Sequence, residues 1–515
     1  MPHPEHPGES TSPQQPDEAG PALDFRAFVE QLLDEGDAVA VEQTVDPHLE
    51  VGAVTRRAYE LAAPAPLFTS LTGAEPGFRI LGAPAGMSSG RLGEYGRIAR
   101  HLGLPRTAGP RDILERLVAA MHANPVVVPT GPCRQNVRTG DEVDLEKFPV
   151  PLLHQEDGGR YFGTYGFHIV RSPDGEWTSW SVARTMLRDR TTLVGPAMPQ
   201  QHIGMIHEMW RQRGEHTPWA MVLGAPPAAL AAAGMPLPER VSEDGYVGAL
   251  AGGPVEVVRA QTNDLYVPAR AEIVLEGYLS KDETAPEGPM GEYHGYAFPE
   301  GKRQPVFHVE AVTWRDDPIL PVCAAGLPPE ENHTIWGTMI SASALDVLRS
   351  AELPVEMAWC SYEAATCWIV VSVNRARRAA LGMTEQRLVD AVAETLFSSH
   401  AGWLVPKVIL VDDDIDVTDI RQVVWALATR SHPGTGHHHY PQAPGIPMVP
   451  YLTPEEAGSA RGGKSVTSCL LPDGFRGTTA SFEGSFPRAL REHVVGNWAR
   501  YGYRPEDGAA ATAGA

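Results

Sequence analysis

The local pattern of the sequence changes near residues 125 and 330, and these changes limit the folds that the chain can adopt. From 23 to 124, helix-like segments such as DFRAFVEQLLDEG alternate with strand-like ones such as AVAVEQTV. From 125 to 330 strand signals dominate, and beyond 355 strands and helices alternate again. Because 515 residues exceed what one hydrophobic core normally supports, we expect several domains. The pattern predicts an α/β (α+β) protein with two α/β units around a barrel or mixed sheet.

Capping and turn residues mark the ends of several predicted elements. Asp24 can cap a helix that ends at Gly36, and its apolar face carries Phe25, Phe28, Leu32 and Leu33. The residues SPDG at 172–175 are a strong turn signal between the strand candidates YGFHIV and EWTSWSVARTML. The segment ENHTIWGTMISASALDVLRSA predicts a helix that connects the β-rich region to the C-terminal part.

These signals divide the chain into consecutive regions. Residues 1–22 have the composition of a disordered tail, and so do the last residues, GAAATAGA. The expected regions between them are an α/β unit, a β-rich domain, a connecting helix, a second α/β unit and a C-terminal segment with a helix, at 23–124, 125–330, 331–354, 355–455 and 456–515.

Charge and hydropathy exclude several classes of partner. The formal net charge is −22, from 64 acidic and 42 basic residues, whereas a nucleic-acid surface usually carries a basic patch. No apolar run approaches the roughly 18 to 20 residues that span a bilayer, and the N-terminus lacks the features of a signal peptide. We therefore expect a cytoplasmic protein with no nucleic-acid or membrane partner. The cysteines form no CxxC pair and are expected to be reduced core thiols: Cys133, Cys323, Cys360, Cys367 and Cys469.

The common nucleotide and hydrolase motifs are absent from the sequence. It contains neither a GxxxxGKS/T phosphate loop nor a GxGxxG fingerprint after a strand, and it has no GxSxG. Three consecutive histidines, His437 to His439, occur in GTGHHHYP. Adjacent imidazoles cannot easily face one ion, so a flexible loop is favoured over a metal site there.

The stretch PEGPMGEYHGY at 286–296 places two carboxylates on a constrained turn. Glu287 and Glu292 are separated by glycines and a proline that suit neither a helix nor a regular strand. Loops that display acids on a rigid scaffold are common sites of binding and proton transfer. A solvated acidic turn explains this motif equally well, so the motif alone leaves both interpretations open.

Other chemically capable side chains are scattered through the middle of the chain. Arg184 ends SWSVAR, His202 lies in PQQHIG, and Glu243 lies in RVSEDGYVGA. An imidazole and a carboxylate can hold a hard divalent ion, and an arginine between carboxylates can bind an acid and shift their pKa values. Taken singly, each is more often an ordinary surface or paired side chain. Spacing alone does not bring them together.

Many ordered stretches resemble the UbiD-type decarboxylases, most closely the ferulic and cinnamic acid decarboxylase branch. They run through nearly the whole chain and include APLFTSLTG, GAPAGMS, GPCRQN, TYGFHIV, WTSWSVARTM, PQQHIG, MPLPERVSEDGYVGA, TNDLYVPA, EGPMGEYHGY, ILPVCAAG, LVDDDID and NWARYGY. The resemblance implies an N-terminal α/β unit, a central split-β-barrel flavin-binding domain, a linking helix and a C-terminal α/β oligomerisation domain.

The resemblance also implies chemistry on a modified flavin. Members of this family use prenylated FMN to remove CO₂ from α,β-unsaturated or aromatic acids without net oxidation. For this chain it implies decarboxylation of an α,β-unsaturated acid to an alkene through a cyclic adduct with the flavin. The implied catalytic residues are Arg184, Glu287 and Glu292. Glu292 would supply the proton that replaces the carboxylate, while Arg184 and Glu287 would orient the substrate and keep Glu292 protonatable.

Positions for the cofactor and its ions follow from the same resemblance. The implied flavin contacts are Thr164, Ser181, Val182, Ala183, Arg184, Gln201, His202, Met235, Glu243 and His400. The implied ligands of a divalent ion, Mn²⁺ or Mg²⁺, are Ser179, His202 and Glu243. The implied shell of a monovalent ion, K⁺ or Na⁺, is Trp180, Ala232, Ala233, Met235 and Glu243.

Three positions depart from the family pattern. Ser179 stands where the family has an asparagine ligand to the divalent ion, which leaves the identity of that ion open. His400 stands where a lysine is expected near the flavin phosphate. Trp336 replaces a smaller aliphatic residue of the substrate pocket, which suggests a specialised acid other than ferulate.

Two other functions stay open at this point. One is a reversible (hetero)aromatic acid decarboxylase/carboxylase of the same family, and the other is a flavin-binding protein whose catalysis Ser179 has impaired. The expected partners are a small unsaturated acid, a flavin prenyltransferase that supplies the cofactor, and further copies of the chain. Family members associate through the C-terminal unit, so we expect a homodimer or a larger homo-oligomer.

Overall fold

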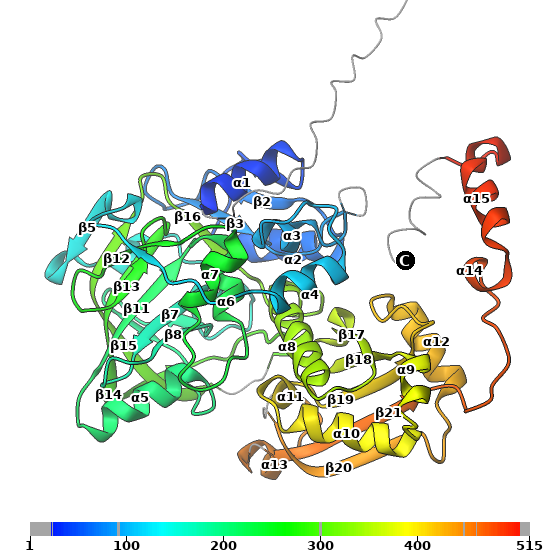
Figure 1. Ribbon diagram of the computed structural model, residues 1–515. Coiled ribbons are helices and arrows are strands. Elements are labelled where there is room, and N and C mark those ends of the chain that lie inside the picture. The colour runs from blue at the N-terminus through cyan, green and yellow to red at the C-terminus, as the bar shows by residue number, and fades with distance from the viewer. Residues whose placement is uncertain are drawn as a thin grey trace, which may run out of the picture.

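Three units and a C-terminal arm make up the computed structural model of the chain (Figure 1). The structure describes residues 22, 24–89, 93–297, 301–445, 449–459 and 461–504. Both predicted tails lie outside the described residues, apart from Ala22. The predicted order, an α/β unit, a β-rich unit, a linking helix and a second α/β unit, is confirmed.

The N-terminal unit is a four-stranded sheet covered by helices. Its strand order is β1-β2-β3-β16, and the strands span Ala38–Val41, Ala65–Phe68, Arg79–Gly82 and Ile319–Val322. Its helices are α1 (Phe25–Asp34), α2 (Glu50–Glu60), α3 (Gly96–His101) and α4 (Pro110–Val118). The predicted cap of α1 is confirmed, because the Asp24 carboxylate accepts a hydrogen bond from the Arg26 amide at 2.8 Å. β16 comes after the strands of the central unit along the chain but pairs in the N-terminal sheet. It therefore connects the two units.

A curled nine-stranded sheet forms the central unit and matches the predicted split barrel. The order is β6-β9-β10-β15-β14-β11-β7-β8, with β5 on β15. In chain order, β5 to β11, β14 and β15 span Asn136–Thr139, Tyr161–Gly163, Gly166–Arg171, Thr178–Ser181, Thr185–Leu187, Thr192–Val194, Thr217–Leu223, Ile273–Glu287 and Lys302–Trp314. Bulges in the pairing of β14 with β15 bend this sheet.

Short helices and a small sheet cover the curled sheet. α5 (His202–Gln212) packs on β7 and β8, while α6 (Pro227–Ala233) packs against α7 (Asp244–Ala251). The small sheet has the order β13-β12-β4, with strands Tyr266–Pro268, Glu256–Arg259 and Val126–Val127. The predicted turn at 172–175 joins β7 to β8, which pair in antiparallel fashion. These elements carry several of the predicted ion residues, among them Ser179 and Trp180 on β8, His202 on α5, and Ala232 and Ala233 on α6.

A long helix links the central unit to the C-terminal unit. A π-helical turn (Asn332–Trp336) leads into α8 (Gly337–Ser350), where the connecting helix was predicted. The C-terminal sheet has the order β17-β18-β19-β21-β20. Its strands, in that order, span Val355–Cys360, Trp368–Val373, Lys407–Asp412, Arg461–Cys469 and His437–Pro444, so the sheet continues past residue 455. Its helices, α9 to α13, are Arg375–Ala380, Glu385–Phe397, His400–Leu404, Ile420–Arg430 and Pro454–Ser459.

The prediction of a flexible loop at the three histidines is wrong. His437, His438 and His439 open strand β20, which pairs with β21 in antiparallel fashion. The alternation of side chains along a strand sends neighbouring imidazoles to opposite faces. The strand therefore turns His438 to one face and His437 and His439 to the other, so the three imidazoles do not share one face.

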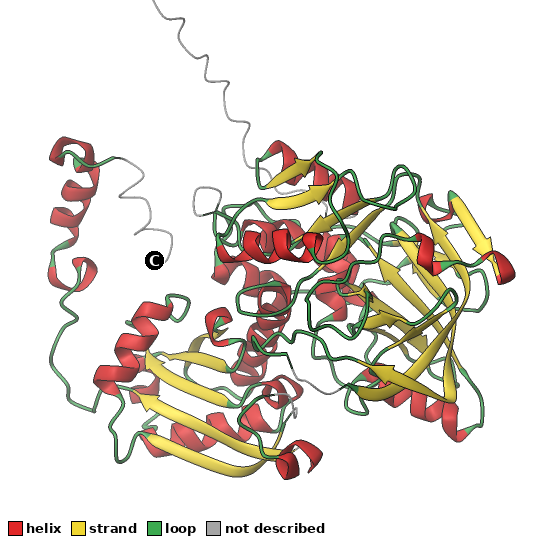
Figure 2. Cartoon of the chain, turned by 180° about the vertical axis from the view of Figure 1, so that it is seen from behind, coloured by secondary structure: helices red, strands yellow, loops and turns green. Residues whose placement is uncertain are grey.

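An arm at 472–504 leaves the C-terminal unit, and in both views its helices stand apart from the three units (Figures 1 and 2). The arm carries α14 (Phe482–Ser485) and α15 (Arg488–Gly496), and neither helix has a buried residue. Its large apolar side chains are exposed: Phe475, Phe482, Phe486, Leu490, Val495, Tyr501 and Tyr503. In the part of the chain that the structure describes, no helix has the length and apolar character of a membrane span.

We expect Asp37→Ala to destabilise the N-terminal unit by about 3–5 kcal/mol, because it leaves a buried charge without its partner. The Arg97 guanidinium donates to Asp37 at 2.7 Å, and the two side chains are 1% and 4% exposed. Thermal unfolding followed by circular dichroism measures the effect. Asp34→Ala, at the exposed end of α1, is the control, with an expected change within about 0.5 kcal/mol. Equal shifts in the two variants would contradict a stabilising role for the ion pair.

Candidate active site

The two glutamates of PEGPMGEYHGY stand at the end of a strand and in the turn that follows it. Glu287 is the last residue of β14. Gly288 then adopts a φ of +82°, a left-handed conformation that favours glycine and takes the chain out of the sheet. Four residues later, Glu292 lies in a turn that the Gly295 amide closes by donating to the Glu292 carbonyl at 2.9 Å. The Gly-Pro spacer therefore makes a bend that turns the second acid back toward the first.

Arg184 joins both acids, as the predicted catalytic set requires. It lies between β8 and β9, and its Nε donates to Glu287 Oε1 at 2.8 Å, while Nη2 reaches Oε2 of the same carboxylate at 3.2 Å. Its Nη1 donates to Glu292 Oε1 at 2.6 Å. The side chains of Arg184, Glu287 and Glu292 are 24%, 1% and 12% exposed. Residues that are 103 and 108 positions apart thus meet in one largely buried cluster.

The electrostatics of this cluster distinguish the two acids. Burial raises the pKa of Glu292; the nearby Arg184 opposes this shift, and the like charge of Glu287 adds to it. Burial alone would lower the pKa of Arg184, but the two carboxylates keep that pKa above its ordinary value. The bidentate pair of Arg184 with Glu287 and the single contact to Glu292 leave Glu292 as the acid that holds a proton more readily.

Tyr161 is a fourth member of the cluster that the sequence did not reveal. It is the first residue of β6, and its hydroxyl donates to Glu287 Oε1 at 2.7 Å. The ring is fully buried, and burial followed by the charge of Glu287 raises its pKa, so it stays a neutral donor. Its only sequence signal is its place within the predicted β-rich region of 125–330, since the partner lies 126 residues away.

A second cluster forms around His202 and Glu243, as the predicted ion site requires. His202 starts α5 and Glu243 precedes α7; His202 Nδ1 lies 2.7 Å from Glu243 Oε1, and the Trp180 amide donates to Glu243 Oε2 at 2.8 Å. Within the described residues, His202 Nε2 is buried and has no hydrogen-bond partner. An orphaned imidazole nitrogen beside a buried carboxylate fits a hard divalent ion.

The departure at Ser179 lies beside this cluster. Ser179 is fully buried on β8, and its Oγ is 2.8 Å from Ser181 Oγ, so each hydroxyl already has a partner. The hydroxyl can act as an oxygen ligand only if this contact is given up or shared. His202 and Glu243 are therefore the stronger candidate ligands of the three.

The other predicted cofactor and ion residues surround the same region. Ala232 and Ala233 end α6, followed closely by Met235, and α6 packs on α7 next to Glu243. Gln201 caps α5 directly before His202. Ser181 ends β8 and is buried; after it, Val182 is exposed, and the carbonyl of Ala183 accepts a hydrogen bond from His168. Thr164 Oγ1 accepts from the Cys323 amide at 3.1 Å, which ties it to the strand β16 side of the site.

Two predicted site residues, His400 and Trp336, come from the C-terminal unit and from the linker. The His400 ring is 6.1 Å from that of His202, and its Nδ1 is 3.0 Å from the Leu237 carbonyl oxygen. Burial lowers the pKa of His400, which favours its neutral form. Trp336 ends the π-helical turn, and its ring meets that of Tyr293 edge to face at 5.6 Å. Because Tyr293 follows Glu292, Trp336 lies close to the acid turn.

Open space lies between the acid turn and the C-terminal unit. A cleft of about 620 Å³ has His294, Tyr296 and Leu327 on one side and residues such as Trp368 and Tyr451 on the other. This volume lies in the usual range of small-molecule sites.

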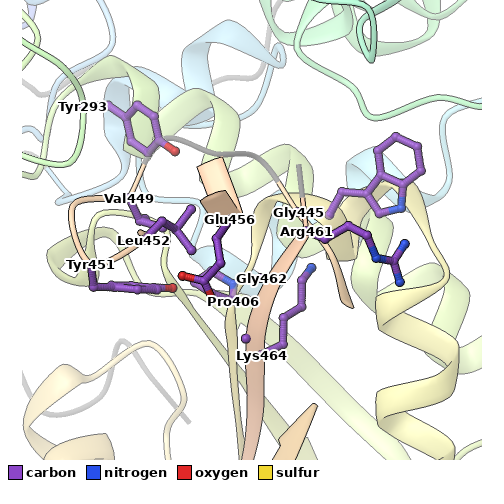
Figure 3. A pocket seen from close by; sticks show the side chains of 12 residues that line it. Tyr293, Pro406, Gly445, Val449, Tyr451, Leu452, Glu456, Arg461, Gly462 and Lys464 are labelled. Atoms are coloured by element: carbon purple, nitrogen blue, oxygen red, sulfur yellow. The ribbon is translucent and has the colours of Figure 1, made fainter. Parts of the chain in front are cut away.

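Figure 3 shows a smaller hollow where Tyr293 faces residues around Lys464. Burial lowers the pKa of Lys464 to about 7, and its Nζ donates to the carbonyl of Gly402.

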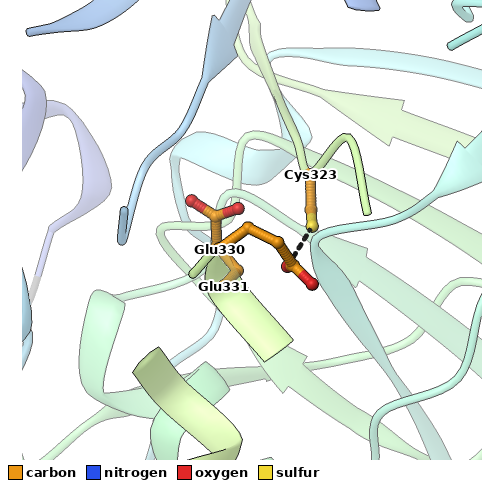
Figure 4. Close-up of side chains that lie close together, drawn as sticks. All are labelled: Cys323, Glu330 and Glu331. Carbon is orange, nitrogen blue, oxygen red and sulfur yellow. Dashed lines mark hydrogen bonds between the residues drawn. The ribbon is translucent and has the colours of Figure 1, made fainter. Parts of the chain in front are cut away.

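A cysteine and two glutamates, Cys323, Glu330 and Glu331, form a buried group (Figure 4), and the Cys323 amide donates to Thr164 Oγ1. Cys323 Sγ donates to Glu330 Oε2 at 3.1 Å, and the Tyr59 hydroxyl donates to Glu331. Burial raises the pKa of Glu331 to about 7 and also raises that of Glu330. Because protein donors already hold these carboxyl groups, the cluster is better explained as a protonated core network than as a metal site.

The cysteines match the prediction of free thiols. All five are unpaired: four are buried and Cys367 is half-buried. Burial of four of them agrees with the expected role in core packing, and Cys323 in addition donates to Glu330.

Comparisons with known proteins agree with this geometry. Profiles of three domains of the 3-octaprenyl-4-hydroxybenzoate carboxy-lyase (UbiD) family match in order: the N-terminal domain at 29–117, the Rift-related domain at 125–328 and the C-terminal domain at 333–469. The chain is 61% identical over 489 residues to the pyrrole-2-carboxylic acid decarboxylase of Pseudomonas aeruginosa, covering 94% of this chain and 99% of that protein. It is 39% identical over 498 residues to ferulic acid decarboxylase 1 of Saccharomyces cerevisiae, covering 94% and 99%.

Fold, site and relatives together define a carboxy-lyase that acts as a decarboxylase. The resemblance seen in the sequence is therefore confirmed. The chain belongs to the UbiD family, in which dependence on prenylated FMN is a family property.

Solved structures support the same fold. The vanillic acid decarboxylase of Sedimentibacter hydroxybenzoicus in its closed form has a TM-score of 0.79 at 24% identity, covering 94% of this chain and 99% of that one. The UbiD-class enzyme HmfF of Pelotomaculum thermopropionicum, solved in complex with FMN, has a TM-score of 0.76 at 24% identity, covering 88% and 95%. These likenesses bear on the three-unit architecture alone.

We expect Ser179→Asn to keep or tighten the binding of a divalent ion, because the longer amide side chain brings a second oxygen ligand within reach of His202 and Glu243. Titration of the purified protein with Mn²⁺, followed by electron paramagnetic resonance, measures this without turnover. The matched loss variant is His202→Ala, for which we expect Mn²⁺ binding to weaken by about 10- to 100-fold or more. Clear loss of Mn²⁺ binding in Ser179→Asn would show that the surroundings of this serine differ from those of the family's asparagine.

Proposed function

We propose that this enzyme removes CO₂ from a heteroaromatic carboxylic acid of the pyrrole-2-carboxylate type. The observation that carries the proposal is the contact of Arg184 with both Glu287 and Glu292, within a chain that is 61% identical to a pyrrole-2-carboxylic acid decarboxylase. The reaction replaces the carboxylate of the substrate by a proton and releases CO₂, without net oxidation.

Arg184, Glu287 and Glu292 differ in charge and protonation, and we assign each a different role. Arg184 is the cation of the cluster and holds the carboxylate of the incoming acid beside Glu287. Glu287 is nearly fully buried and anchored by Arg184 and Tyr161, so it fixes the position of the guanidinium. Glu292 has the raised pKa and supplies the proton to the ring carbon that loses CO₂. Prenylated FMN, when bound, supplies the electron sink that these side chains lack.

A second candidate function is decarboxylation of an acyclic α,β-unsaturated acid of the ferulate type. The 39% identity to ferulic acid decarboxylase 1 over 94% of the chain favours it. We rank this function second because the identity to its relative is lower and because the bulky Trp336 lies beside Tyr293. A large indole next to the acid turn leaves less room for an extended side chain, and a small flat ring needs less.

We propose the cofactor and ion sites from the residues already placed. Residues 181–184, Thr164, Gln201 and Met235 would contact the flavin, and His202 and Glu243 would hold Mn²⁺ or Mg²⁺ against its phosphate, with Ser179 as a weaker third ligand. Carbonyl groups near Trp180 and at the end of α6 would hold K⁺ or Na⁺. The His202 Nε2 atom without a partner supports the divalent site most directly. A flavin prenyltransferase would supply the modified cofactor.

We also propose that the chain forms a homodimer through its C-terminal unit. The arm supports this, because α15 has nine residues and none of them is buried. So short a helix is marginally stable in water unless something covers its apolar side chains. A second copy of the chain is a partner that is always present when the protein is in solution.

Release of CO₂ from a panel of acids by protein co-expressed with a flavin prenyltransferase tests the proposed function. We expect the highest kcat/KM for pyrrole-2-carboxylate and a lower one for cinnamate and ferulate. Glu292→Gln keeps the shape of the side chain but cannot transfer the proton, so kcat should fall by about 100- to 10,000-fold while flavin stays bound. Preference for cinnamate would favour the second candidate, and a wild-type rate in Glu292→Gln would overturn the assigned role.

We expect Glu287→Gln to move the alkaline limb of the pH–rate profile to lower pH. Glu292 donates in its protonated form, and that form is lost as the pH rises through its raised pKa. The charge of Glu287 is one cause of that raised pKa, so a neutral amide lowers it and activity ends at a lower pH. Profiles of kcat at constant ionic strength measure the limb. A shift to higher pH, or no shift with full flavin occupancy, would contradict the coupling of the two acids.

A further inference from the structure

We propose that Asp157 and His333 are positioning residues that clamp the turn carrying Glu292 from both sides. The inference rests on the proposed function for its catalytic meaning, but the contacts exist independently of it. Neither residue belongs to the predicted site, and they lie on different units of the fold. Asp157 precedes β6, and His333 lies in the π-helical turn of the linker.

On one side, the Asp157 carboxylate holds the backbone just before Glu292. Its side chain is 0% exposed, and its Oδ1 accepts a hydrogen bond from the Gly291 amide at 3.0 Å. Its Oδ2 accepts from the His154 amide at 3.0 Å, so the carboxylate itself is fixed. A charged acceptor makes a stronger hydrogen bond than a neutral one. The amide that precedes the proton donor is therefore firmly placed.

The residue after Asp157 adds a second contact on this side. The Gly158 amide donates to the Pro289 carbonyl at 2.7 Å. A Cβ at position 158 would lie 2.0 Å from the Gly288 carbonyl oxygen, so only glycine lets the two segments approach this closely. Residues 157 and 158 thus hold the turn at two of its peptide groups.

On the other side, the His333 ring holds the backbone just after Glu292. Its side chain is 0% exposed, and its Nδ1 accepts from the Glu330 amide at 3.0 Å. Nε2 therefore carries the hydrogen and donates to the Tyr293 carbonyl at 2.6 Å. Burial lowers the pKa of His333 to about 4, so this neutral form persists across the working pH range. The linker helix is thereby joined to the acid turn.

The two contacts hold the peptide groups just outside those of Glu292, at the Gly291 amide and the Tyr293 carbonyl. Between them, hydrogen bonds within the turn hold the Glu292 backbone, because its amide donates to the Tyr296 carbonyl at 3.0 Å and its carbonyl accepts from the Gly295 amide at 2.9 Å. Together these contacts limit the positions of the Glu292 carboxyl group relative to Arg184. A displacement of about 1 Å in a catalytic group can cost about 100-fold in rate. Removal of either contact should therefore lower kcat more than it changes KM or flavin binding.

Paired variants separate positioning from general loss of structure. His333→Leu removes both polar contacts of the ring, while His333→Gln keeps an amide N–H that can donate to Tyr293. Asp157→Ala removes the acceptor, while Asp157→Asn keeps one oxygen for the Gly291 amide. His308→Leu on β15, a partly exposed histidine paired with Glu283, is the matched control. The measurements are kcat, KM, flavin content and hydrogen–deuterium exchange of the peptide that covers residues 288–297.

For His333→Leu and Asp157→Ala we expect hydrogen exchange at the acid turn to rise about tenfold, because each variant loses one hydrogen bond that stabilises the turn. We expect kcat to fall about 10- to 100-fold, with KM within about threefold and flavin content unchanged. His333→Gln and Asp157→Asn should recover most of kcat, and His308→Leu should match the wild type.

Unchanged exchange at the turn in both truncated variants would overturn the clamp. So would faster exchange across β14 together with loss of flavin, since that pattern marks a structural role only. If His333→Leu does not fold, the comparison of Asp157→Ala with Asp157→Asn decides alone. If the wild type releases CO₂ from no acid, the proposed function fails, but the exchange measurement still decides whether the clamp exists.

Discussion

The Arg184 guanidinium is the contact on which the arrangement of the site depends. It binds Glu287 through two nitrogens and Glu292 through the third, and all three side chains are at least three-quarters buried. Without it, two carboxylates would face each other in a site of low polarity, which costs several kcal/mol per uncompensated charge. The fold must therefore deliver an arginine from the connection between β8 and β9, which do not pair, and two acids from the end of β14 and the turn after it. The curled sheet does this: β8 is one end strand, β9 lies beside the opposite end strand β6, and the connection between β8 and β9 brings Arg184 to Glu287 at the end of β14.

The units on either side of the central sheet also contribute residues to the site. β16 returns to the N-terminal sheet after the acid turn, and the linker then starts with a π-helical turn that carries both His333 and Trp336. His400, from the C-terminal unit, reaches the ring of His202. Residues from three units thus border one region, which explains why the motifs that mark it are scattered through the whole sequence. A shorter piece of the chain could not assemble it.

Local signals in the sequence predicted local structure well. The cap at Asp24 and the turn at 172–175 depend on neighbours within a few residues, and both are confirmed. The acid motif was ambiguous by itself, and only the family resemblance linked it to Arg184. Tyr161, Asp157 and His333 were missed, because their partners lie 126, 134 and 40 positions away and no motif marks such pairs. The histidine tract was assigned to a loop because its strand character comes from pairing with β21, a tertiary effect.

The balance of charge explains why Glu292, rather than Glu287, is suited to move a proton. Glu287 and Glu292 both contact the Arg184 guanidinium, and the charge of Asp157 also acts on Glu292, so this buried group holds three carboxylates and one guanidinium. Glu287 is compensated by two nitrogens of Arg184 and by the Tyr161 hydroxyl, and Asp157 by the Gly291 and His154 amides. Glu292 has a single contact to Arg184, while burial and both neighbouring acids raise its pKa. Uptake of a proton by Glu292 therefore relieves the excess of negative charge at the lowest cost, and in the proposed reaction this proton replaces the carboxylate of the substrate.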